Sequence, residues 1–277
     1  MEITRHSIEA GSYYPDPNFK DSIFIHHTSG HYRPDWTIDS WGRDRKESTN
    51  KIRSGASYVI GGPDPTNSKN KKHDGEILEA FNSEYWSHHL FLKNKSNTFL
   101  NQKSIAIEIC NYGELTKTVE GEFFTRNNIK IPKEQVEILS KPFKGERYFH
   151  SYSENQIESL RYLLLLIAKK HGIDLKRGLL KEIERSELKI PENLSIKDQK
   201  KWMNKNGITD SKGKKMIENN DEDIRYLQAI DYLGSNPFDV SPQASQGFQG
   251  LWSHSNVRAD IRDCYPSQQM IQMIRSL

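Results

Sequence analysis

Hydrophobic and polar positions alternate in three short segments of the chain, at residues 22–27, 57–62 and 104–110. A period of two is typical of β-strands, in which successive side chains point to opposite faces of a sheet. The second segment continues into Gly61-Gly62-Pro63 and a lysine-rich stretch, and an apolar pair, Ile77-Leu78, follows. This pattern predicts a long β-hairpin with a solvated, basic loop.

A helical period appears further along the chain. Ser153 and Gln156 have the spacing of a capping box, and an apolar stripe follows at Ile157, Leu160, Leu164 and Ile167, ending before His171-Gly172. Pro266 is predicted to begin a terminal helix that carries Met270, Ile271 and Ile274. Strands interleaved with helices predict an α/β fold, with a central mixed β-sheet flanked by helices.

Residues 176–248 differ in composition from the rest, being rich in Lys, Glu and Asn, and no repeat is visible in them. We expect short helices near 196–205 and 221–233. The simplest organisation is one domain over residues 1–277, with a helical insertion at about 176–248.

The first strand ends on two histidines. Alternation places Ile23, Ile25 and His27 on one face and Phe24 and His26 on the other, so the two imidazoles point apart. At most one of them can serve a given site. A histidine that ends a strand can also simply bind the backbone, and the segment alone leaves both interpretations open.

Glu108 lies in the third strand, on the face shared with Ala106, whereas Ile105, Ile107 and Ile109 fill the other face. A carboxylate on an apolar strand is costly unless its charge is compensated. Glu108 therefore indicates either a solvent-facing strand or a functional site.

Composition excludes few functions. The chain has 34% hydrophobic and 28% charged residues and a net charge of +3, and no apolar run approaches the roughly 18 residues of a membrane span. A mildly basic balance suits an anionic polymer partner, but weakly. The first twenty residues lack a signal-peptide profile. We expect a cytoplasmic protein, a phage-encoded one released by lysis, or a chain whose leader has been removed.

Two cysteines, Cys110 and Cys264, are too few for a disulfide framework. They could pair, or have structural or metal-binding roles. Cys264 follows His254 by ten residues in a turn-rich segment, and a histidine and a cysteine can be zinc ligands. Taken alone, this spacing is a weak signal.

Four segments, in order, resemble the zinc-dependent N-acetylmuramoyl-L-alanine amidases, a superfamily that includes amidase-type phage lysozymes and the peptidoglycan recognition proteins. They are IFIHHTSG, NQKSIAIEICNYG, the capped Leu-rich helix after Ser153, and WSHSNVRADIRDCYP. The resemblance covers residues 20–175 and 248–277, so the insertion at 176–248 is atypical of the family.

The resemblance implies one Zn²⁺ per chain, held by His26, His254 and Cys264, with the fourth tetrahedral position left open for water. It also implies that Glu108 is the general base. Arg262 occupies the place of the family's lysine, which stabilises the tetrahedral oxyanion; an arginine can do so by charge but cannot transfer a proton.

The chain departs from the family at several positions. The catalytic Tyr-His pair of the phage lysozymes and recognition proteins is missing, since the chain reads Ala56-Ser57-Tyr58. The family's usual D-P-G-P after the third ligand is replaced by Cys264-Tyr-Pro-Ser. The segment from Trp86 to His89 resembles a W-H-A-G loop whose histidine contacts substrate. The implied substrate-binding residues are Trp86, His89, Asn256 and Arg258.

The function implied is hydrolysis of the amide between N-acetylmuramic acid and L-alanine of the stem peptide. A catalytically inactive peptidoglycan-binding module of the same fold is the alternative, and a lytic effector would use the same chemistry with another delivery route. The expected partner is peptidoglycan or a muropeptide, with no nucleic acid and no membrane, and the chain is expected to be a monomer.

Overall fold

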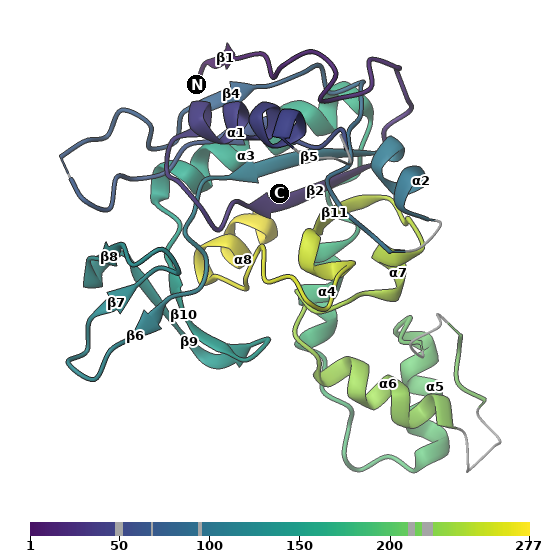
Figure 1. Ribbon diagram of the computed structural model, residues 1–277. Coiled ribbons are helices and arrows are strands. Elements are labelled where there is room, and N and C mark those ends of the chain that lie inside the picture. The colour runs from purple at the N-terminus through teal and green to yellow at the C-terminus, as the bar shows by residue number, and fades with distance from the viewer. Residues whose placement is uncertain (48–51, 68, 94–95, 210–213, 218–223) are drawn as a thin grey trace.

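We describe a computed structural model of the chain, covering residues 1–47, 52–67, 69–93, 96–209, 214–217 and 224–277. Within these ranges the central sheet has six strands in the order β1-β4-β3-β5-β2-β11 (Figure 1). They are β1 (Ile3–Arg5), β2 (Ser22–His27), β3 (Tyr58–Ile60), β4 (Ile77–Glu79), β5 (Ser104–Ile109) and β11 (Gly250–Ser253). The pair β3–β4 is antiparallel and the other neighbours are parallel, so the predicted mixed sheet is confirmed.

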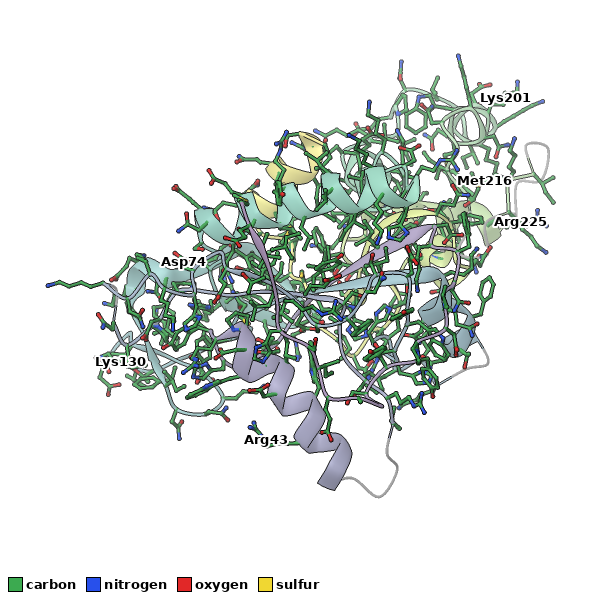
Figure 2. All side chains as sticks on the ribbon, turned by 90° about the horizontal axis from the view of Figure 1, so that it is seen from above. Arg43, Asp74, Lys130, Lys201, Met216 and Arg225 are labelled. Atoms are coloured by element: carbon green, nitrogen blue, oxygen red, sulfur yellow. The ribbon has the colours of Figure 1, made fainter. Side chains whose placement is uncertain are left out.

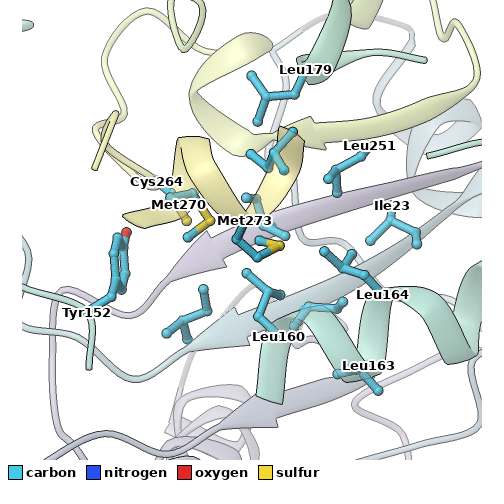
Figure 3. Close-up of a cluster of buried hydrophobic side chains, with 14 of the residues drawn as sticks. Ile23, Tyr152, Leu160, Leu163, Leu164, Leu179, Leu251, Cys264, Met270 and Met273 are labelled. Carbon is cyan, nitrogen blue, oxygen red and sulfur yellow. The ribbon is translucent and has the colours of Figure 1, made fainter. Parts of the chain in front are cut away.

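One face of the sheet is covered by α3 (Glu154–His171), α4 (Leu179–Ser186) and α8 (Gln268–Arg275). The alternating isoleucines of β2 and β5 point into this main core, where they meet leucines of α3 and methionines of α8 (Figure 3). Burial of this much apolar surface is the principal stabilising term of the fold.

The other face lies under α1 (Pro34–Glu47) and α2 (Ser96–Lys103). Ile38 of α1 packs on Val59 and Leu78, while Leu100 of α2 packs on Phe24 and Trp252. His26 and Glu108 belong to this face by alternation.

The helix α3 begins as its sequence predicts. The Ser153 hydroxyl accepts a hydrogen bond from the Gln156 backbone, and the Gln156 side chain accepts one from the Ser153 backbone. It ends at Gly172, whose φ of 68° is in the left-handed region that favours glycine. The terminal helix α8 begins two residues after Pro266.

The β3–β4 hairpin is present as predicted. In the described residues, seven strands were not predicted. They are β6 (Thr116–Lys117), β7 (Phe123–Phe124) and β8 (Lys130–Ile131) of a three-stranded sheet, β9 (Val136–Phe143) and β10 (Glu146–His150) of a hairpin, and β1 and β11 of the central sheet. The first three have only two residues each, too few for a period to be visible.

The segment 176–248 is helical, as expected. Its first helix, α4, packs on β11 and α8 in the main core. By contrast, α5 (Ile196–Lys205) and α6 (Ile224–Gly234) share a separate apolar cluster. The first residues of the expected 221–233 helix lie outside the described ranges. A four-residue helix, α7 (Pro242–Ser245), precedes β11.

Figure 2 shows Lys201 and Met216 at one end of the molecule and Lys130 of the small sheet at the other. In the described part of the chain, no helix has the length and apolar character needed to cross a membrane.

Candidate metal centre

The carboxyl ends of β2, β5 and β11 meet at one edge of the sheet. His26 is directly opposite Glu108 in the β2–β5 register, and His254 follows the last residue of β11, which pairs with Ile25. Three parallel strands from distant parts of the sequence therefore bring two imidazoles and a carboxylate to one place.

His26, His254 and Asp263 form a buried group whose ligand atoms all lie within 4.8 Å of one another. The Asp263 Oδ2 atom is 3.1 Å from His254 Nδ1 and 3.4 Å from His26 Nδ1. Two imidazole nitrogens and one carboxylate oxygen are a donor set typical of catalytic zinc, with a fourth position for water or substrate. The residues present therefore fit the metal that the family resemblance implies.

Burial and charge shape this group. Burial by itself would raise the pKa of Asp263, but the facing imidazoles of His254 and His26 hold this pKa well below its usual range. Burial, and then the charge of His254, lowers the pKa of His26 to about 4. The group thus favours an ionised Asp263 carboxylate beside a neutral His26 imidazole, and metal binding needs both of these protonation states.

The third ligand predicted at Cys264 is not in this group. Cys264 is fully buried in the main core (Figure 3), and its thiol is hydrogen-bonded to Tyr152. The chain turns between the two residues, so Asp263 faces the histidines. Asp263-Cys-Tyr-Pro266 has the Asp-x-x-Pro spacing of the family's D-P-G-P, and counting back from Pro266 would have identified Asp263.

Both cysteines are free thiols, and they lie in different apolar clusters. His27 points away from the metal group, as alternation predicts, and its Nδ1 atom is 2.9 Å from the Tyr152 hydroxyl.

Glu108 lies beside the metal group and borders a cavity of about 420 Å³, lined also by Thr28, His31, Trp36, Trp41 and Arg43. Burial, and then the charge of Asp263, raises the pKa of Glu108 well above its usual range. A carboxyl that reaches a cavity and has a raised pKa is suited to general acid–base chemistry near neutral pH.

Arg262 is directed elsewhere. Its Nε atom donates to the backbone oxygen of Lys144, and its guanidinium is 3.6 Å from both Glu114 and Glu146. These contacts engage its charge with two carboxylates and do not support the oxyanion role expected from the sequence.

Three of the four predicted substrate-binding residues lie in the interior. Trp86 stacks on Tyr14, and Asn256 donates to the backbone oxygens of Pro237 and Asp239. His89 is buried behind His26. Their polar or aromatic groups are held by the protein, so the structure does not place them at a substrate surface. Arg258 is the most exposed of the four and is paired with Asp260.

A family model described as N-acetylmuramoyl-L-alanine amidase matches residues 16–188, more than half of the chain. His26 and Glu108 lie within the matched residues, and His254 and Asp263 follow them. No curated protein sequence matches the chain.

Among solved structures, the chain is similar to PlyL at 12% identity and a TM-score of 0.35, over 64% of this chain and 78% of that one. It is similar to a mutant endolysin from Bacillus subtilis at 16% identity and a TM-score of 0.33, over 63% and 80% of the two chains. It is also similar to the E. coli amidase AmiD, in complex with its substrate anhydro-N-acetylmuramic acid-L-Ala-D-gamma-Glu-L-Lys, at 19% identity and a TM-score of 0.32, over 61% and 49%.

Proposed function

Since this chain belongs to the N-acetylmuramoyl-L-alanine amidase family, we propose that it is a zinc-dependent peptidoglycan amidase. The bond that it hydrolyses is the amide between N-acetylmuramic acid and L-alanine of the stem peptide. The observation that carries the proposal is the convergence of His26, His254 and Asp263 beside Glu108.

The three ligands would hold one zinc ion, which when bound supplies Lewis-acid polarisation of the scissile carbonyl. Asp263 contributes the negative charge of the ligand set, and the two histidines contribute neutral nitrogen donors. This set replaces the one expected with Cys264.

Glu108 is the residue that moves protons. Its carboxylate takes a proton from the attacking water and delivers it to the nitrogen of the departing alanine, which leaves as an amine. The cavity beside Glu108, bordered by Trp36 and Trp41, is large enough to admit part of the substrate.

The test uses the purified chain, a muropeptide of defined structure, and mass spectrometry of the products. We expect a stem peptide with a new amino-terminal alanine, a sugar with a free lactyl carboxylate, and about one zinc per chain. Glu108→Gln should lower the rate by about 100-fold or more while zinc content is unchanged. Glu120→Gln, on the exposed surface, is the matched control.

Cleavage between sugars or within the peptide would refute the assigned bond. Binding of wall fragments without product release would favour the non-catalytic alternative. Full activity of Glu108→Gln would refute the assigned base.

A further inference from the structure

His89 lies on the loop between β4 and α2 and touches no cavity described above, yet it contacts a metal ligand directly. Its Nδ1 atom is 3.0 Å from His26 Nε2, on the side of the His26 ring opposite the metal-facing Nδ1. Both imidazoles are almost fully buried. The contact is a hydrogen bond between two rings, so one nitrogen must donate and the other accept.

The direction of this hydrogen bond follows from its continuation. His89 Nε2 is 2.8 Å from the Ser104 hydroxyl, and that hydroxyl donates to the backbone oxygen of Leu100 over 2.6 Å. A carbonyl oxygen can only accept, so the single hydrogen of Ser104 is used there. Ser104 Oγ must then accept from the N–H of His89 Nε2.

A neutral imidazole that carries its proton on Nε2 has an unprotonated Nδ1. His89 Nδ1 therefore accepts, and His26 Nε2 donates. The remaining nitrogen of His26, Nδ1, is left with a lone pair directed toward Asp263 and His254. The series of hydrogen bonds from Leu100 through Ser104 and His89 thus sets which nitrogen of His26 can bind a metal.

Leu90, the residue after His89, has the corresponding role for His254 through its backbone oxygen. His254 Nε2 donates to the backbone oxygen of Leu90 over 3.0 Å, which again leaves Nδ1 free to face Asp263. The backbone N–H groups of His89 and Leu90 both donate to the side chain of Asn101, a fully buried residue of α2. One dipeptide, fixed to α2, orients both imidazole ligands.

We propose that His89 is a positioning residue of the metal centre, which holds His26 in the tautomer that presents Nδ1 to the metal. This inference rests on the proposed metal-dependent function. It assigns His89 a different role from the substrate contact that its place in the sequence predicts. Partners of this kind raise the basicity of a ligand and fix its orientation.

The experiment compares His89→Leu, which removes both ring nitrogens, with His89→Gln, whose amide can accept from His26 and donate to Ser104. The neighbouring His88→Leu is the matched control, since His88 contacts Asn97 and not a ligand. Zinc affinity is measured by competition with a chromophoric chelator. The tautomer of His26 is read in the metal-free proteins from its imidazole ¹⁵N resonances.

We expect His89→Leu to lose roughly 10- to 100-fold in zinc affinity, and His89→Gln and His88→Leu to stay within about threefold of the parent. In the metal-free parent, His26 should carry its proton on Nε2, and in His89→Leu this preference should be lost. A purely structural role would lower the melting temperature without changing the tautomer.

A folded His89→Leu that keeps its zinc affinity, or a parent whose His26 carries its proton on Nδ1, would overturn the inference. If His89→Leu does not fold, Ser104→Ala is the second variant. It removes the hydrogen-bond partner of His89 Nε2 and should again weaken zinc binding. Failure of the parent to bind zinc would refute the proposed function, and the tautomer in the metal-free parent would still decide the role of His89.

Discussion

Asp263 and Cys264 are neighbours in sequence with opposite environments. The carboxylate faces two imidazoles, whereas the thiol lies in the main core and contacts Tyr152. We expect Asp263→Asn to lower zinc affinity by at least about tenfold, because the amide lacks the charge of the ligand set. Chelator competition at neutral pH measures this.

Cys264→Ala is the matched substitution. It should keep zinc affinity and lower the free energy of unfolding by about 1–2 kcal/mol, because it removes a buried sulfur from a packed site. Urea unfolding of the metal-free protein measures the change. The reverse result, with zinc lost in Cys264→Ala and kept in Asp263→Asn, would restore the ligand predicted from the sequence.

His150 is a buried histidine outside the metal centre. Its Nε2 atom is 3.2 Å from the Gln135 side-chain oxygen, and burial, then the charge of His27, lowers its pKa to about 3. Above the unfolded pKa of 6.5 the ring is neutral in both states, and its contribution to stability is complete. As pH falls from 6.5 toward 3 the unfolded state binds the proton first, so this contribution is lost.

His150→Gln cannot titrate in this range. Its free energy of unfolding should therefore fall less steeply with acidification than that of the parent, by about 1.4 kcal/mol per pH unit between pH 6 and 4. Chemical denaturation at several pH values, with chelator present, measures the slope. Equal slopes for the two proteins would show that His150 is protonated in the folded state as readily as in the unfolded state.

At the residue scale, the sequence predicts what alternation can decide. The opposite directions of His26 and His27, and the common face of His26 and Glu108, both follow from the period of a strand. The direction of the Asp263 side chain does not follow from it. The loop from His254 to Asp263, called the ligand loop below, has no hydrophobic period, and a shift of one residue exchanges a carboxylate for a thiol. The burial of His89 and Asn256 depends on loops whose paths only the tertiary structure sets.

At the scale of elements, the β9–β10 hairpin supports the ligand loop. Lys144, at the hairpin tip, donates from Nζ to the backbone oxygens of Ser255, Arg258 and Ile261. Burial lowers the pKa of Lys144 to about 8, so the amine is still charged at neutral pH. One side chain thus fixes three points of the loop that joins His254 to Asp263.

Lys144→Met should lower the free energy of unfolding by about 2 kcal/mol, because three carbonyl oxygens lose a charged donor. It should also weaken zinc binding, since the loop that presents two ligands is released. Lys141→Met, on the exposed side of the same hairpin, is the control and should change neither quantity. Calorimetry with and without zinc measures both; unchanged zinc affinity in Lys144→Met would show that the loop keeps its shape without the lysine.

The elements that the sequence predicts correctly have strong local signals. The capping box of α3 and the glycine after it define that helix almost to the residue, and α5 spans Ile196–Lys205 as expected. The hairpin that carries Lys144 has weak signals, because β9 mixes exposed apolar and charged residues and contains Pro142. The contacts of its tip with the loop between His254 and Asp263, made by Lys144, join residues more than a hundred positions apart in the sequence.

At the scale of the molecule, α5 and α6 stand apart from the sheet (Figure 1). Among the residues that the structure describes, their apolar cluster, built around Met203 and Leu233, shares none with the main core. Glu182 of α4 links this cluster to the main core. Its carboxylate accepts hydrogen bonds from the hydroxyls of Tyr232, in α6, and Ser241, and it pairs with Arg185. Composition indicated a distinct segment at 176–248, but could not show that α4 belongs to the main core.

Separate apolar cores predict separate unfolding. Met203→Ala should destabilise α5 and α6 by about 2–5 kcal/mol, since a fully buried side chain is lost from a small cluster. Native-state hydrogen exchange should then quicken in these two helices, while the amides of β2 and β5 keep their protection. Leu164→Ala in the main core is the converse control and should quicken exchange in the sheet. If Met203→Ala accelerates exchange in the sheet as well, the contacts of Glu182 join the two parts into one cooperative unit, and the metal centre depends on the insertion for its stability.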